Sequence, residues 1–190
     1  MNRIALVAVF WIAAASFVRA DTPATQPATA PAATPARLAY ERFKSLAGEW
    51  EGQSTKGWTE RLSIRPIAGG SCVMETSTFA HGDGDAMVTM YHLDGEQLML
   101  THYCMAKNQP RLRATEISSD GRELTFTFVD GTNLPSRDVG HMDKVRIWFE
   151  GDDGFRSQWT FYAKGKEQWM EAITYKRVTG GATTQKSEAR

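Results

Sequence analysis

The chain contains few of the residues that build metal centres and disulfide frameworks. Of its 190 residues, 2 are cysteine and 4 are histidine, and they show none of the spacings typical of zinc sites. The G-x-S-x-G, H-E-x-x-H and phosphate-loop motifs are missing as well. The sequence therefore names no reaction, and we expect no metal.

The sequence also lacks an excess of charge of either sign. Lysine and arginine number 22, aspartate and glutamate number 22, and no basic run is interleaved with aromatic residues. Surfaces that bind nucleic acid are usually strongly basic. We therefore do not expect nucleic acid as a partner.

Long apolar runs are lacking outside the N-terminus. There, Arg3 precedes an apolar run from Ile4 to Phe17, and Val18-Arg19-Ala20 supplies a small-residue cleavage site. This pattern predicts a signal peptide at residues 1–20. The run is too short to span a bilayer comfortably, and no cysteine follows it to carry a lipid. We expect a periplasmic or secreted product without a transmembrane domain; an uncleaved anchor is the alternative.

Two further segments have little to bury. Residues 21–36 are rich in Pro, Ala and Thr, which is typical of a flexible linker. Residues 179–190 contain Gly, Thr and charged side chains and are expected to form a disordered tail. The remaining residues 37–178 have the length of one ordinary domain.

Within that domain the helical period is confined to residues 37–46, which follow Pro35 and predict a short amphipathic helix. Beyond Gly48, β-rich runs recur at intervals of about ten residues, each bounded by Gly, Asp or Pro. Strands are expected at 48–54, 59–65, 72–79, 87–93, 96–104, 111–118, 122–129, 142–150, 155–162 and 167–178.

The connections between these runs are mostly hairpin-sized and contain glycine, which predicts an antiparallel meander. Closing so many strands into a barrel removes the exposed sheet edges. The predicted fold is therefore all-β: a closed antiparallel up-and-down β-barrel of about ten strands with a short N-terminal helix.

The hairpin expected at residues 87–104 supplies the first candidate site. An Asp94-Gly95 turn places alternate residues on opposite faces, and the face richer in large aliphatic groups is expected to point inward. That face carries Tyr91 and His102. Burial would keep the His102 imidazole neutral, able to orient a ligand. The alternative is a core histidine bonded to a neighbouring hydroxyl or carbonyl.

The next hairpin supplies two arginines. An Asp120-Gly121 turn would pair Ile117 with Leu124 and place Arg111 and Arg113 on the inward face. Buried guanidiniums need counter-charge, which a ligand carboxylate would supply bidentately. The alternative is a three-residue loop, which would exchange the two faces of the strand and expose both arginines to water.

The sequence from Leu46 to Gly52, LAGEWEG, resembles the opening of the lipocalin and fatty-acid-binding superfamily, whose first strand carries Gly-x-Trp after a short helix. The matching residues are Gly48 and Trp50. The resemblance implies that Trp50 plugs the closed end of the barrel under a basic residue of the last strand, a place for Arg177. Fatty-acid-binding proteins also hold a ligand carboxylate with interior arginines. The layout of residues 37–178 is similar to uncharacterised exported bacterial lipocalin-like proteins.

Haem-binding barrels of the nitrobindin type are a weaker resemblance. Those proteins ligate iron with a histidine on a late strand, whereas residues 142–178 contain no histidine. Haem is therefore disfavoured, and no cofactor is expected.

The two cysteines are not expected to pair. Cys72 opens the third strand and Cys104 closes the fifth, and these strands run parallel in a meander. Their sulfurs then lie at opposite ends of strands about 20 Å long, beyond the roughly 7 Å Cα separation that a disulfide spans.

Two loop regions of the sequence are candidates for a lid or for metal sites. Residues 130–141 form the one long irregular loop, typical of a lid or binding loop, or of a plain insertion. His81 with its neighbouring aspartates, and His141 between Asp138 and Asp143, could suggest metal loops. Neither has a recognised ligand spacing, so solvated loops are expected.

These observations favour an exported barrel that binds a small apolar or amphipathic, even acidic, ligand, with Tyr91, His102, Arg111 and Arg113 at the polar end of the cavity. One alternative is a lipocalin-like isomerase or cyclase that uses His102 as acid or base. Another is an envelope interaction module without a ligand. Catalysis is the less favoured interpretation, and no residue is assigned as catalytic.

Overall fold

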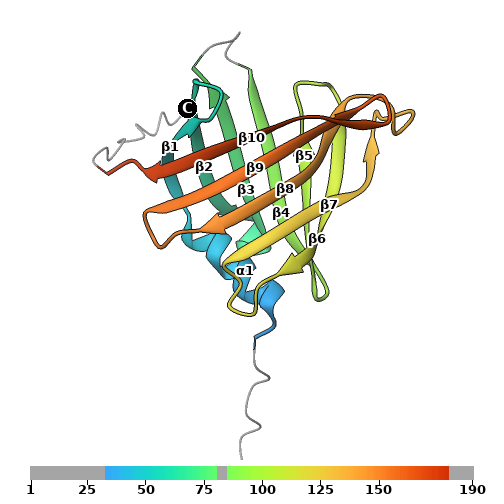
Figure 1. Ribbon diagram of the computed structural model, residues 1–190. Helices are drawn as coiled ribbons and strands as arrows, with labels where there is room; N and C mark the ends of the chain where they lie inside the picture. The colour runs from blue at the N-terminus through green and yellow to red at the C-terminus, as the bar shows by residue number, and fades with distance from the viewer. Residues whose placement is uncertain (1–32, 81–84, 180–190) are drawn as a thin grey trace, which may run out of the picture. The chain divides into compact units, whose positions relative to one another are not determined.

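The computed structural model describes residues 33–80 and 85–179, which form one closed barrel preceded by a helix (Figure 1). The predicted signal peptide, most of the linker, His81 and most of the tail lie outside these residues. No helix in the described ranges is long and apolar enough to cross a membrane. The elements are α1 (Pro35–Ser45), β1 (Gly48–Ser54), β2 (Thr59–Ile67), η1 (Ala68–Gly70), β3 (Cys72–Phe79), β4 (Ala86–Asp94), β5 (Gln97–Tyr103), β6 (Gln109–Ile117), β7 (Glu123–Thr132), β8 (His141–Phe149), β9 (Gly154–Ala163) and β10 (Lys166–Arg177).

The strands follow one another around the barrel in chain order, and β10 closes it by pairing with β1. Every neighbouring pair is antiparallel, as in the register Trp50 opposite Arg177 across the closing seam. The predicted ten-stranded up-and-down barrel is therefore confirmed. Because the ladder closes on itself, none of the ten described strands lies at an edge of the sheet.

Helix α1 covers one end of the barrel, which we call the helix end (Figure 1). The Thr34 side chain accepts a hydrogen bond from the backbone N–H of Arg37, and Pro35 occupies the first turn, where its missing N–H costs nothing. Phe43 is buried and stacks on Tyr91 of β4, with ring centroids 4.1 Å apart. The helix thus fills this half of the barrel with apolar side chains.

Trp50 and Arg177 complete the closure of the helix end. Trp50 is 1% exposed, and the Arg177 guanidinium lies 4.2 Å from its ring centroid. Arg177 donates hydrogen bonds to the carbonyls of Ala47 (2.8 Å) and Ser45 (3.2 Å). Gly48 has φ +135°, and a Cβ there would lie 2.9 Å from Arg177 Nη1. Glycine at this position lets the guanidinium approach the chain closely.

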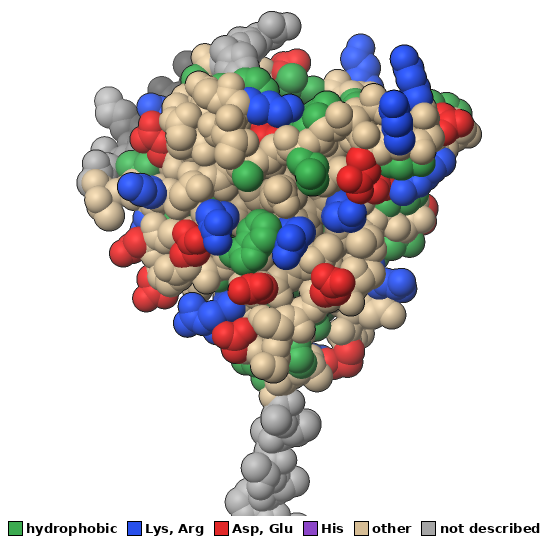
Figure 2. Space-filling view, in the orientation of Figure 1, with side chains coloured by type: hydrophobic (Ala, Val, Ile, Leu, Met, Phe, Trp, Pro, Cys, Tyr) green, Lys and Arg blue, Asp and Glu red, His purple; other side chains and the backbone are tan. Residues whose placement is uncertain are grey.

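The opposite end, which we call the far end, carries the β1–β2, β5–β6, β7–β8 and β9–β10 turns. The outer surface mixes charges of both signs: Figure 2 shows lysine and arginine interleaved with aspartate and glutamate across one face. The interior is different, because the buried ionisable side chains of the far half include no lysine or arginine among the described residues.

Candidate functional site

A small cavity lies inside the far half of the barrel. Its volume is about 30 Å³, enough for two or three water molecules or one small head group. Polar and apolar side chains share the lining, which comprises Glu60, Glu75, Ser77, Phe79, Met87, His102, Met142, Trp159, Glu171 and Ile173.

Three glutamates from β2, β3 and β10 supply the acidic part of the lining. Each continues an alternating inward face, as Glu60 does ahead of Leu62 and Ile64. Tyr175 donates a hydrogen bond of 2.6 Å to Glu60, and Tyr91 donates one of 3.2 Å to Glu75.

The third glutamate, Glu171, accepts a hydrogen bond from Ser54 of β1. Each carboxyl is therefore held by a hydroxyl of the barrel wall.

Burial perturbs two of these carboxyls strongly. Desolvation raises the pKa of Glu75 to about 8, and the nearby Glu60 charge adds to the increase. Desolvation likewise raises the pKa of Glu60 to about 7, although hydrogen bonds from Tyr175 and Ser77 oppose it. A carboxyl with such a pKa changes charge near neutral pH, which is a recognised property of functional sites.

His102 lies on the same wall. Its Nδ1 is 3.0 Å from the Thr89 hydroxyl, and its ring is 5.0 Å from Trp159 between centroids. The side chain is 3% exposed, yet Nε2 has no hydrogen-bond partner. Burial lowers the pKa of His102 to about 4, so the imidazole is neutral at physiological pH. An unpaired buried nitrogen beside a cavity is unusual in a folded protein.

Half-buried apolar side chains separate the acidic groups from the far end. Phe79, Met87 and Met142 belong to the cavity lining. Phe79 contacts Trp58, with ring centroids 6.4 Å apart, and Lys56 lies over the Trp58 ring. We call Trp58, Phe79, Met87 and Met142 the apolar rim.

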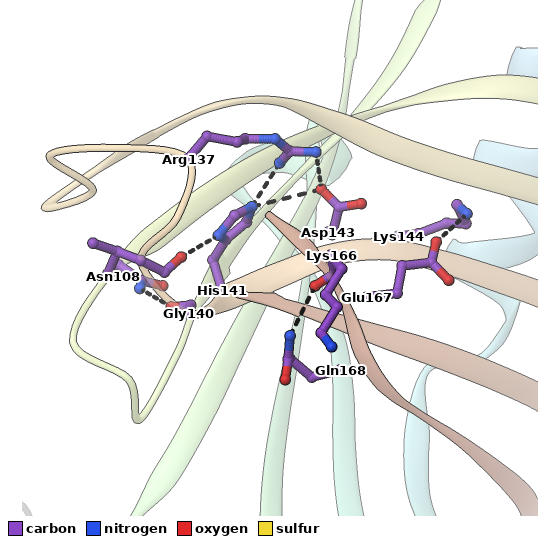
Figure 3. A network of polar contacts seen from close by, with 10 residues as sticks. Asn108, Arg137, Gly140, His141, Asp143, Lys144, Lys166, Glu167 and Gln168 are labelled. Atoms are coloured by element: carbon purple, nitrogen blue, oxygen red, sulfur yellow. Dashed lines mark hydrogen bonds and ion pairs between the residues drawn. The ribbon is translucent and has the colours of Figure 1, made fainter. Parts of the chain in front are cut away.

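The loop between β7 and β8 is anchored by a polar network (Figure 3). His141 is fully buried: its Nδ1 lies 2.6 Å from the carbonyl of Val139, and its Nε2 lies 2.6 Å from Arg137. Arg137 forms an ion pair with Asp143 at 2.5 Å. Since the carbonyl can only accept, His141 carries its proton on Nδ1.

The same loop is tied to both neighbouring turns. The Asn108 side chain donates a hydrogen bond of 2.8 Å to the carbonyl of Gly140. The backbone N–H of Lys164 donates one to the backbone carbonyl of Asp138. Within residues 33–80 and 85–179, no cluster of three His, Cys, Asp or Glu side chains is arranged to hold a metal. His141 is thus a buried structural anchor, and the solvated loop expected for it is wrong.

The predicted hairpin site is reproduced with a changed register. Asp94 pairs with Gln97, so the turn is Gly95-Glu96 and every pairing is shifted by two residues. A shift of two preserves the faces. Tyr91 and His102 therefore point inward, and Tyr91 lies toward the helix end, under Phe43.

The inward orientation expected for Arg111 and Arg113 is wrong. Both are exposed, and Arg111 forms a bidentate ion pair with Asp130 on the outer surface. The predicted pairing of Ile117 with Leu124 is correct, but a β-bulge adds Thr115 to β6. One extra residue reverses the alternation beyond it, and both guanidiniums turn to water.

Sequence reasoning missed the three interior glutamates. A usable signal was present, since Glu75 follows Val73 at the strand period of two, and Glu171 precedes Ile173 and Tyr175 in the same way. A glutamate that continues an apolar face of a strand predicts a buried carboxyl.

A larger hollow of about 410 Å³ lies outside the barrel, over β6, β7 and β8, and includes Arg146 and Trp148. None of its lining side chains has a buried polar atom without a partner among the described residues. The interior cavity is therefore the better candidate site.

The fold and this cavity define an antiparallel β-barrel with a polar, acid-lined interior. No protein-family model matches the sequence, and no curated protein is significantly similar to it. A solved protein of unknown function from the DUF3598 family of Nostoc punctiforme has 17% sequence identity and a TM-score of 0.50. The match covers 72% of this chain and 49% of that protein, so this chain spans about half its length.

Two further solved structures are less similar. A redesigned beta barrel, b11L5F_LGL, has a TM-score of 0.36 at 9% identity over 72% of this chain and 95% of its own. EF1p2_mFAP2b bound to DFHBI has a TM-score of 0.35 at 11% identity over 74% of this chain and 98% of its own. The likeness to the Nostoc protein shows a shared barrel fold and no function.

Proposed function

We propose that this chain is an exported, lipocalin-like barrel that binds a small apolar or amphipathic molecule at the far end. The observation that carries the proposal is the buried, unpartnered Nε2 of His102 beside the cavity. An unsatisfied buried polar atom costs about 1–3 kcal/mol, which a ligand that pairs with it would recover.

The size of the cavity defines how such a molecule is held. A volume of about 30 Å³ admits only a small polar head group, since a water molecule takes roughly 10–15 Å³ on this measure. The rest of the molecule would lie against the apolar rim. Export is inferred from the N-terminal pattern, and the lipocalin-like character is supported by the packing of Trp50 under Arg177.

Native and denaturing mass spectrometry of the processed protein, purified from its cell envelope without detergent, tests this proposal. We expect a small-molecule mass that disappears on denaturation. It should be reduced in Ser77→Val, which adds methyl groups at the cavity wall, and retained in Thr174→Leu, which alters an exposed position of β10.

A second measurement makes the test decisive when no mass is retained. Amphipathic compounds at about 1 mM should raise the melting temperature if the cavity binds them even weakly. If no mass is retained and no compound shifts the melting temperature of the wild type more than that of Ser77→Val, the proposal is contradicted. An interaction module would then be the better interpretation.

A further inference from the structure

We propose that the head group held in the cavity is a small organic cation, such as the ammonium of a primary amine. This inference rests on the proposed function and names the class of ligand that the same site takes. Four groups carry it, namely the carboxyls of Glu60, Glu75 and Glu171 and the unpartnered Nε2 of His102; all four residues line the cavity.

The first argument is the missing counter-charge. Three carboxyls share the interior. In addition to burial, the charge of Glu171 raises the pKa of Glu60, and the charge of Glu60 raises the pKa of Glu75. No lysine or arginine in the described part of the chain is buried with them. Each ionised carboxylate removed from water costs several kcal/mol unless it is paired. A cation in the cavity would provide the pairing.

The second argument is hydrogen-bonding capacity. The hydroxyl donors around the cavity are already directed at the carboxyls: Tyr175 and Ser77 at Glu60, Tyr91 and Thr89 at Glu75. Burial raises the pKa of both tyrosines well above the usual value, so they remain donors. Once the carboxyls are ionised, free donors are therefore scarce, and the remaining hydrogen-bonding capacity of the site is to accept.

His102 extends this pattern. Thr89 lies directly opposite both Glu75 on β3 and His102 on β5. If its hydroxyl proton is given to ionised Glu75, its oxygen accepts from His102 Nδ1–H, which leaves Nε2 as an acceptor. The lone pair of Nε2 then faces the cavity without a donor. A ligand that donates protons satisfies it, whereas a ligand carboxylate would be repelled by the glutamates.

The third argument is the surroundings of the head group. Trp159 lines the cavity, and aromatic faces attract cations. The described residues hold no metal-ligand cluster, which favours an organic ammonium over a metal ion. A cavity of about 30 Å³ accommodates such a head group, and its alkyl part would contact the apolar rim.

Binding would be coupled to proton release. The titratable groups facing Glu75 are Glu60 on β2, Tyr91 on β4, His102 on β5, and Glu171 and Tyr175 on β10. Glu75, with a pKa of about 8, holds its proton at neutral pH, and a cation would displace that proton to solvent. The affinity for the cation should therefore rise between pH 6 and pH 8.5.

Isothermal titration with hexylamine, 1-hexanol and hexanoate, each up to about 1 mM at pH 8.5, tests the inference. The three probes share an alkyl chain and differ in the charge of the head group. We expect hexylamine to bind at least about 10-fold more tightly than hexanol, and hexanoate not to saturate. At pH 7, the heat of hexylamine binding should depend on the ionisation enthalpy of the buffer.

Matched variants locate the effect. Glu60→Gln and Glu75→Gln keep the side-chain shape and remove the charge, so each should weaken hexylamine binding about 10-fold and leave hexanol unchanged. Glu51→Gln, on the exposed outer face of β1, should change neither. Melting curves of all variants establish that they are folded.

Each contrary result has its own meaning. If hexanol binds as tightly as hexylamine, the cation assignment fails while the binding function stands. If hexylamine binds but neither interior substitution weakens it, the site is wrong. If none of the probes saturates, the cation assignment is overturned, and the native mass measurement then decides the proposed function separately.

Discussion

At the scale of single residues, two interior glutamates lower the free energy of unfolding of the barrel. Glu60 and Glu75 could be replaced by apolar side chains, since Leu62 and Val73 occupy the same inward faces. The retained carboxyls are hydrogen-bonded but lack a basic partner among the described residues. Removing such groups from water costs free energy of folding.

The stability of the protein should therefore fall as the pH rises. Glu75 has a pKa of about 8 in the folded chain against an ordinary value of 4.5. Between these values the folded state binds a proton that the unfolded state releases, so the free energy of unfolding decreases with pH. The loss is absent below about pH 4.5 and complete above about pH 8.

Glu75→Gln should remove much of this dependence. We expect the variant to exceed the wild type in free energy of unfolding by at least about 2 kcal/mol at pH 9 and to match it near pH 4.5. Urea unfolding at several pH values measures the difference. The exposed Glu51→Gln serves as control, and equal pH dependence of the wild type and Glu75→Gln would show that the carboxyl is ionised without penalty.

At the scale of elements, one extra residue decides which side chains of β6 point inward. The β6–β7 turn has the pairing that its sequence predicts. The bulge at Thr115, however, exchanges the inward and outward faces in the part of β6 that lies between the bulge and the far end. Leu112 is completely buried as a result, and Arg111 pairs with Asp130 outside. The bulge thus keeps positive charge out of the acidic interior.

Deletion of Thr115 should be tolerated, with a loss of stability below about 1.5 kcal/mol. The residues on either side of Thr115 pair with Thr125 and Phe126, which are adjacent on β7. Removing the extra residue therefore makes these pairs consecutive and keeps Leu112 inside and both arginines outside. Thr115→Ala keeps the bulge and removes a methyl group and an exposed hydroxyl that donates to the carbonyl of Thr125, so it should change the stability by less than about 1 kcal/mol. Chemical denaturation of both variants makes the comparison, and a deletion that lowers the stability by more than about 3 kcal/mol would contradict the position of the extra residue at Thr115.

At the scale of the whole molecule, the two halves of the barrel are filled differently. The helix end is filled by α1, Trp50 and their aromatic neighbours, and Arg177 ties its last strand to the chain after the helix. The far half encloses the cavity under a rim of half-buried side chains. The end where binding is proposed therefore lies opposite the end that the helix closes.

The closed topology also fixes the distance between the two cysteines, both of which are free. Cys72 pairs with His92 on β4, whereas Tyr103, the residue before Cys104, pairs with Val88. The two thiols are thus separated by roughly 16 Å along β4, too far for a disulfide. Alkylation of the denatured, unreduced protein should add two groups per molecule, and an unchanged mass would contradict this arrangement.

The sequence by itself determined the architecture. Strand-length runs with a period of two, bounded by turn residues, predicted ten strands, and their hairpin-sized connections left an antiparallel meander as the simplest arrangement. The inward face of Tyr91 and His102 also followed, because a register shift of two residues does not change the faces of a strand. These features depend on local chemistry, which a sequence displays directly.

The composition of the cavity was decided by the tertiary structure alone. Whether Arg111 faces the ligand or the solvent depends on a bulge that no turn residue announces. Glu60, Glu75 and Glu171 lie far apart in the chain and meet only because β2, β3 and β10 close around one space. The raised pKa values of Glu60 and Glu75 arise from burial inside the closed barrel, which is a property of no single strand.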